Sequence, residues 1–156
     1  MSQFSESNLS GCNFSNAVLD KCSFVSCNLD CSKFISSSLN YALFNKADIS
    51  NCDFSNSKMF GANFSESIGE NSNFSNCSIE MTTYTKGNFI NSIFKNSKFR
   101  YTDFSYANIS DCDFSNSSFH YSRHQSTVSN RTKFTNTTGI MEIDNVQLKA
   151  DLWIQS

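Results

Sequence analysis

The feature that most constrains this chain is a large apolar residue at every fifth position. From Phe4 to Phe119, each of these positions holds Phe, Leu, Ile, Met or Tyr, and Gly69 is the single exception. Of the 16 Phe residues, only Phe60 lies outside this frame. A second frame, two residues earlier, begins with the small residues Ser7, Cys12, Ala17, Cys22 and Cys27. Each unit therefore reads small, any, large apolar, polar, polar.

Neither a continuous helix nor a flat strand can bury residues that are spaced by five. An α-helix turns about 100° per residue, so residues five apart diverge by roughly 140° around the helix axis. A strand alternates its faces with period two, so an odd spacing sends successive Phe residues to opposite sides. A chain that runs extended for two or three residues and then turns a corner points every large residue inward. The period therefore predicts a coil with one five-residue unit on each side.

Asn residues indicate how many sides close one coil. They recur with a period of 20, at positions 16, 56, 76, 96, 116 and 136. Asn tolerates the left-handed backbone of a tight corner, and stacked Asn side chains can hydrogen-bond to one another. Four sides per coil follow, with Phe on two opposite walls and mostly Leu, Ile or Met on the other two. Six coils then make a rod on the order of 30 Å long.

These units resemble those of the pentapeptide-repeat family, in which a small residue, often followed by Asp or Asn, precedes a Leu or Phe and two polar residues. The segments CDFSN (52–56), ANFSE (62–66) and ANISD (107–111) carry the resemblance. It implies an all-β fold, a right-handed quadrilateral β-helix of six to seven coils.

Two segments and one residue depart from the regular pattern. We expect residues 1–139 to form the β-helix and residues 140–156 to form a C-terminal cap or interaction segment, as a strand or a helix. Residues 121–133 are either a degraded seventh coil or a loop outside the rod. At Gly69 we expect a bulge that swings Ile68 inward, because a dry hole there would forfeit packing contacts.

Composition sets limits on partners and location. The net charge is −2, from 14 acids against 12 Lys and Arg, so no direct contact with nucleic acid or with a membrane surface is expected. No basic start, apolar export signal or membrane span is visible in the sequence, which favours the cytoplasm. Export by a machinery that reads no such signal stays open.

The Cys and His residues give no sign of catalysis. Six of the 7 Cys residues fall in the small inward frame, and Cys31 is the exception, so we interpret them as packing residues with free thiols. His120 and His124 have no accompanying nucleophile motif, phosphate-binding loop or metal spacing. We therefore expect no enzyme activity, no cofactor and no metal site.

The resemblance implies several functions that differ in partner. The best understood branch of the family protects type II topoisomerases from quinolones by imitating DNA with a dimeric, acidic rod; other members are toxin-resistance factors, secreted effectors, targeting modules or scaffolds. A type II topoisomerase and a homodimer are thus among the implied partners. Lys58, Lys95, Lys98 and Arg100 interrupt the acids, so the surface is a weak imitation of a polyanion.

One outer corner carries an apolar stripe, which is our candidate partner site. The 20-residue period stacks positions 41, 61, 81, 101 and 121, and Phe60 lies beside Gly61. Aromatic residues and Met are enriched where proteins bind partners. The stripe either binds another protein or packs against the C-terminal segment. Its large residues are Tyr41, Phe60, Met81, Tyr101 and Tyr121.

Overall fold

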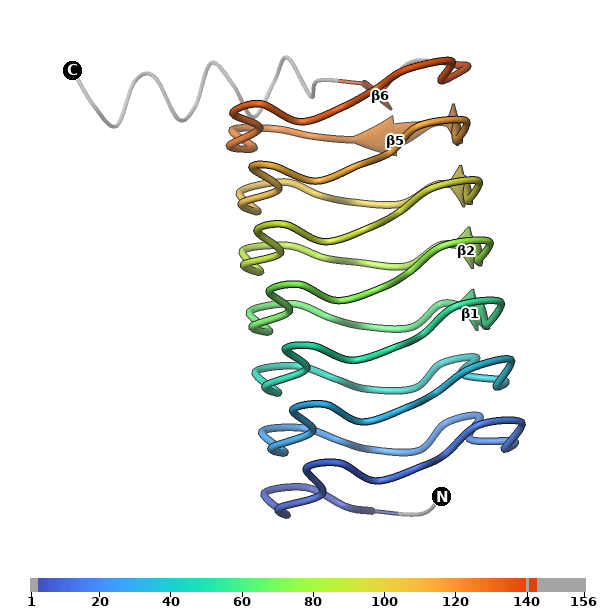
Figure 1. Ribbon diagram of the computed structural model, residues 1–156, viewed down its shortest axis with the longest axis vertical. Helices are drawn as coiled ribbons and strands as arrows, with labels where there is room; N and C mark the ends of the chain where they lie inside the picture. Colours follow the sequence, from blue (N-terminus) through green and yellow to red (C-terminus); the bar gives the residue numbers. More distant parts are fainter. Residues whose placement is uncertain (1–2, 140, 143–156) are drawn as a thin grey trace, which may run out of the picture.

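The computed structural model describes residues 3–139 and 141–142, and they form a four-sided coil of parallel stacked turns (Figure 1). Bridges join residues 20 positions apart, such as Gln3 with Ser23 and Asp113 with Lys133. At 20 residues per coil, the 137 residues from 3 to 139 make just under seven coils. The fold is thus the all-β quadrilateral β-helix that the five-residue period predicts.

The regular strands lie above one another along one side of the rod (Figure 1). They are β1 (Lys58–Phe60), β2 (Ser78–Glu80), β3 (Lys98–Arg100) and β4 (Ser118–His120), which pair in parallel in that order. A second pair joins β5 (Ser122–Arg123) to β6 (Met141–Glu142), also in parallel. None of the described residues forms a helix long and apolar enough to cross a bilayer.

Every corner of the coil uses left-handed backbone two residues after the large apolar residue. Non-Gly residues in this frame have φ between 49° and 63°, and Gly11 and Gly61 occupy it at 70° and 64°. The Asn column lies at one of the four corners, and Asn136 Nδ2 donates a hydrogen bond to Asn116 Oδ1 at 3.3 Å. The corner role predicted for Asn is confirmed, and Asn51, Asn71 and Asn91 occupy a second corner with the same backbone, whereas the remaining two corners use other residues.

Two columns of stacked aromatic rings interlock in the core. Phe54 stacks on Phe34 and Phe74 with ring centroids 4.8 Å apart and nearly parallel planes. From the opposite wall, Phe44 and Phe64 meet Phe54 edge to face at 5.6 Å, with interplanar angles of 89° and 88°. Offset stacking and edge-to-face contacts are both favourable geometries. Each inner ring is thus held by its own column and by the opposite one.

The small inward residues fit the tight interior of the coil, and their side chains also donate hydrogen bonds. Ser57 Oγ donates to the carbonyl of Phe34 at 2.6 Å, and Ser97 Oγ donates to that of Phe74 at 2.8 Å. Cys52 Sγ and Cys112 Sγ make the same contact, at 3.0 Å to Leu29 and 2.8 Å to Phe89. A side chain in this frame therefore ties each coil to the carbonyl of a large residue 23 positions earlier.

The segment 121–133 is a seventh coil and not a loop. Arg123, Val128 and Lys133 bridge to the residues 20 positions before them, and left-handed corners recur at Ser126 and Arg131. The expected cap of residues 140–156 lies outside the described residues, apart from the backbone pairing of Met141 and Glu142 with β5.

The predicted bulge at Gly69 is wrong. Ile68 stays in register, bridging Asp48 and Asn88, and its side chain is 49% exposed. The ring of Phe89 fills the space instead, since a Cβ on Gly69 would lie 2.7 Å from two atoms of that ring. A Cβ on Gly87 would lie 2.4 Å from it. Two glycines thus make room for one aromatic ring where the wall otherwise holds Leu or Ile.

Replacing Phe54 by Ala should lower the free energy of unfolding by about 3 to 5 kcal/mol, because four neighbouring rings lose their contacts. Denaturant unfolding measures the change. Val18→Ala is the control, since Val18 is 79% exposed. Equal effects of the two substitutions would contradict the interlocked core.

Gly69→Ala should lower the free energy of unfolding by about 1 to 3 kcal/mol through overpacking against Phe89. The same substitution in a Phe89→Leu background should cost much less, because Leu leaves room for the added methyl group. Thermodynamic coupling in this double-mutant cycle measures the contact. Additive effects would show that Gly69 is required for another reason.

Candidate functional site

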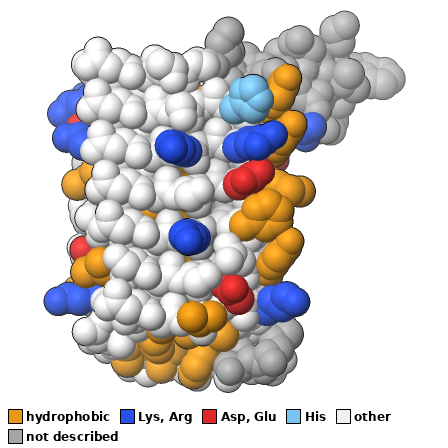
Figure 2. Space-filling view, turned by 90° about the vertical axis from the view of Figure 1, so that its right-hand side faces the viewer, with side chains coloured by type: hydrophobic (Ala, Val, Ile, Leu, Met, Phe, Trp, Pro, Cys, Tyr) orange, Lys and Arg blue, Asp and Glu red, His pale blue; other side chains and the backbone are white. Residues whose placement is uncertain are grey.

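The apolar stripe lies on the surface, at the corner that follows strands β1 to β4. Figure 2 shows hydrophobic side chains running along one edge of the face that carries these strands. Tyr41, Met81, Tyr101 and Tyr121 are 49%, 57%, 49% and 50% exposed, and Phe60 is partly buried. The 20-residue register therefore brings together all five residues that the sequence analysis selected.

Aromatic contacts hold the two ends of the stripe in place. At one end, Tyr41 meets Phe60 edge to face at 5.3 Å, and its ring covers Gly61, where a Cβ would lie 2.8 Å from it. At the other end, Tyr101 stacks on Tyr121 at 5.2 Å with an interplanar angle of 12°. Arg100 lies over the Tyr101 ring, with Cζ 5.5 Å from the ring centroid. Contacts within the protein thus hold the exposed rings at both ends of the stripe.

A hollow of about 360 Å³ opens beside the stacked tyrosines. It is lined by Tyr101, Thr102, Asp103, Tyr121 and Arg123. One carboxylate oxygen of Asp103 accepts a hydrogen bond from the Ser105 N–H at 2.8 Å. The hollow therefore combines aromatic walls with one acid and one cation. Sequence reasoning missed it, because it depends on the directions of side chains from two successive coils.

The stripe residues adopt backbone that bulky side chains seldom take. Tyr41, Met81, Tyr101 and Tyr121 have φ between 51° and 58°. Such a conformation costs of order 1 kcal/mol or more outside Gly and Asn. All four corners of the coil adopt it, so the backbone alone does not distinguish the stripe from the other corners. The large apolar side chains at this corner are what distinguish it.

The outward face of β1 to β4 is positively charged, unlike the chain as a whole. It carries Lys58, Lys98 and Arg100 against one acid, Glu80, which gives three cations minus one acid, or +2 with His120 neutral. Arg100 Nη1 lies 3.8 Å from Glu80 Oε1, whereas no ion pair among the described residues involves either Lys58 or Lys98. The sequence analysis counted these cations but did not place them. The 20-residue register would have done so.

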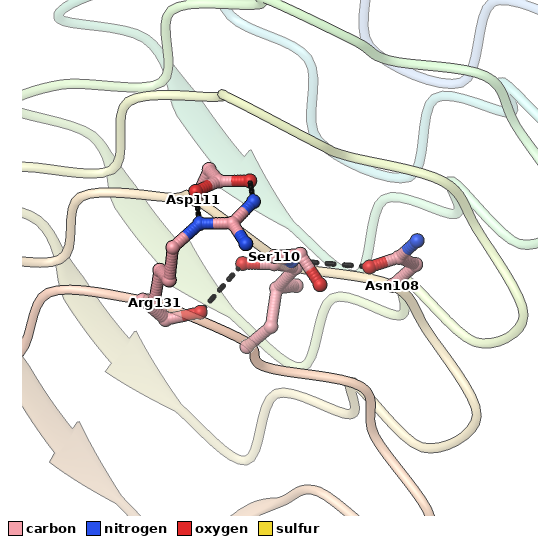
Figure 3. Close-up of polar contacts among 6 residues, drawn as sticks. Asn108, Ser110, Asp111 and Arg131 are labelled. Atoms are coloured by element: carbon pink, nitrogen blue, oxygen red, sulfur yellow. Dashed lines mark hydrogen bonds and ion pairs between the residues drawn. The ribbon is translucent and has the colours of Figure 1, made fainter.

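Several acids on the other faces already form ion pairs with basic residues of the same chain. Arg131 donates two hydrogen bonds of 2.6 Å to the carboxylate of Asp111, from Nε and Nη2 (Figure 3). The hydrogen bonds and charge of Arg131 lower the pKa of Asp111. Burial disfavours the charged form of Asp113, but hydrogen bonds from Ser115 and from Lys95, at 3.0 Å, outweigh it and lower the pKa of Asp113. These acids do not form an open polyanion.

The inward thiols are unsuited to nucleophilic chemistry. Burial raises the pKa of Cys52, Cys77 and Cys112 to about 12, so these thiols stay protonated at neutral pH. Burial also lowers the pKa of His124, whose Nδ1 is buried without a hydrogen-bond partner. Within the described part of the chain, no three His, Cys, Asp or Glu residues group as metal ligands would.

The geometry defines a solenoid protein, in which successive coils contact only their neighbours and present stacked columns of side chains. A family model for pentapeptide repeats matches the sequence in 8 copies, over residues 2–34, 27–66, 47–80 and 85–120. The chain belongs to the pentapeptide-repeat family. A search of curated proteins found no match.

The chain is similar to several solved structures, at low sequence identity and with TM-scores below 0.5. QnrB1, a plasmid-mediated fluoroquinolone resistance protein, is 21% identical with a TM-score of 0.42, over 98% of this chain and 84% of QnrB1. A pentapeptide repeat protein of the Arabidopsis thaliana thylakoid lumen is 23% identical with a TM-score of 0.34, over 70% and 69%. HetL of the cyanobacterium Nostoc, involved in heterocyst differentiation regulation, is 10% identical with a TM-score of 0.33, over 87% and 73%.

Arg131→Gln should lower the melting temperature at pH 7, and this effect should shrink as pH falls towards 2. Because the hydrogen bonds and charge of Arg131 hold the folded pKa of Asp111 below its usual value of 3.8, the contribution of this carboxylate to stability is present above pH 3.8 and is lost as pH falls through the folded pKa. Lys133→Gln, on the same coil, is the control. A shift that persists unchanged at pH 2 would show that Arg131 acts through packing and not through its charge.

Proposed function

We propose that this protein is a non-enzymatic rod that binds another protein through the apolar stripe. The observation that carries the proposal is the row of half-exposed Tyr41, Met81, Tyr101 and Tyr121 along one corner. Interfaces concentrate their free energy in a few aromatic anchors at well-packed positions. The stacked pair Tyr101 and Tyr121, with the hollow beside it, is the strongest such anchor on the stripe.

The rod is proposed to act by binding and not by chemistry. Cys52, Cys77 and Cys112 are buried with raised pKa values, and solenoids present extended surfaces that suit recognition. The proposed location is the cytoplasm, where free thiols persist.

A type II topoisomerase is the partner that we propose to test first, with protection of the enzyme from an inhibitor as the outcome. This choice rests on the family resemblance. The alternative is an effector, targeting or scaffold role with a different partner. The proposal does not require DNA mimicry. Asp111 and Asp113 form ion pairs with Arg131 and Lys95, and the face beside the stripe is positively charged, so the surface does not resemble a polyanion.

The double substitution Phe60→Ser with Tyr101→Ser should weaken partner binding tenfold or more, which corresponds to roughly 1.4 kcal/mol per decade. The melting temperature should change little, because both side chains lie on the surface. The measurement is affinity for purified gyrase subunits, followed by capture from lysate with the wild-type rod and the variant as matched baits. Val18→Ser with Tyr106→Ser is the control, since both residues are exposed on other columns.

Three results separate the alternatives. Retention of gyrase by the wild type and its loss from the variant would support the topoisomerase proposal. Specific loss of host or secretion components would favour the effector or targeting role. Equal capture by wild type and variant would contradict the stripe as the binding site, and a sharp fall in melting temperature would show that the stripe is buried by the protein itself.

A further inference from the structure

The stripe and the face beside it form one continuous surface, which is apolar along the corner and positively charged next to it. The large apolar side chains follow the corner, and Lys58, Lys98 and Arg100 project from β1 and β3 next to them. Figure 2 shows basic side chains on this face, with the hydrophobic band along its edge. A partner that covers the stripe therefore also meets these cations.

The spacing of these groups is set by the stacking of the coils. Adjacent coils are about 4.8 Å apart, the distance between paired strands, and the ring centroids of stacked Phe residues, 4.7 to 5.1 Å apart, agree with it. Lys58 and Lys98 lie two coils apart, which is about 10 Å. Tyr41 and Tyr121 lie four coils apart, which is about 19 Å.

An α-helix lying parallel to the rod fits this spacing. Its pitch is about 5.4 Å, so residues seven apart are separated by about 10.5 Å along the axis. Two acids seven residues apart would reach Lys58 and Lys98 together. A helix of about 13 residues spans the stripe. An extended strand repeats its side chains on one face every 6.6 to 6.8 Å, which does not fit steps of one coil.

The charges decide which kind of helix the surface accepts. Glu80 is the one acid on the outward face of β1 to β4, and Arg100 lies 3.8 Å from it. Asp20, in the same column as Glu80 and Arg100 but nearer the N-terminus, accepts hydrogen bonds from Ser38 and Asn40. On the other side of the stripe, the charges of Asp103 and Arg123 sum to zero. Lys58 and Lys98 make no ion pair among the described residues, so a partner can neutralise their charges.

We propose that the surface docks an acidic amphipathic helix, with the apolar side of the helix on the stripe and its carboxylates on Lys58 and Lys98. The proposal rests on the proposed function and names the chemistry of the partner segment. Complementary charge sets which partner is accepted and speeds association, while the aromatic anchors supply most of the affinity.

The test uses two stapled helical peptides of 14 residues with identical Leu positions. One carries Glu at the positions that flank the Leu stripe, and the other carries Lys at the same positions. Fluorescence anisotropy with the full-length protein measures both affinities. The Glu peptide should bind at least tenfold more tightly than the Lys peptide, and the difference should shrink as salt rises.

Charge reversal identifies the residues responsible. Lys58→Glu with Lys98→Glu should weaken binding of the Glu peptide about tenfold and strengthen binding of the Lys peptide. Lys33→Glu with Lys133→Glu is the matched control, because both lysines are exposed on another wall, and it should change neither affinity. Melting temperatures confirm that each variant is folded.

Several outcomes would overturn the proposal. No binding of the Glu peptide, or equal binding of both peptides, would reject an acidic helix. Unchanged binding after Lys58→Glu with Lys98→Glu would do the same. If the Phe60→Ser with Tyr101→Ser variant still lost its protein partner in that case, the stripe would stand as a binding site, and only the acidic helix would fall.

Discussion

The structure depends on the interlocking of two columns of aromatic rings from opposite walls. Phe34, Phe54 and Phe74 stack on one wall, and Phe44 and Phe64 wedge edge to face against them from the other. A ring can take part in both contacts only if every coil turns at the same four points. The demand for uniform corners explains the left-handed backbone at every fifth residue, and the small inward frame leaves the backbone close enough to the rings.

Uniform coils also determine what the surface can present. Because residues 20 apart are bridged in register, each outward column repeats at about 4.8 Å along the rod. A column of like residues becomes a continuous strip without any further folding. The corner after β1 to β4 thus carries a strip of large apolar side chains, and the face beside it carries Lys58, Lys98 and Arg100. In the proposed function, the binding surface is therefore made of stacked columns of side chains and not of a pocket built from distant segments.

Much of the fold could be predicted from the sequence, because spacing alone excludes a helix and a flat strand. The period of 20 also placed Tyr41, Met81, Tyr101 and Tyr121 in one column, as the structure has them. The hand of the coil came from the family resemblance and not from spacing. Gly69 was misread, since its partner Phe89 is 20 residues away and the choice between a bulge and a ring in the gap depends on a side-chain rotamer.

Other features were missed because residue types and counts do not show where side chains lie in space. The thiols were read as small apolar groups, yet Cys52 and Cys112 donate hydrogen bonds to carbonyls of the preceding coil. Lys58 and Lys98 were counted as interruptions among acids, although the register places them on one face. The hollow beside Tyr101 follows from side-chain directions that no periodicity encodes.

The central claim, that one corner of this rod is a protein-binding strip, can be tested most directly by site-specific photo-cross-linking in cells. A photoreactive residue at position 81 lies in the middle of the stripe, and one at position 96 lies at the Asn corner on another edge of the same rod. We expect a discrete cross-linked partner from position 81 and none from position 96. Equal adducts from both positions, or none from position 81, would contradict it.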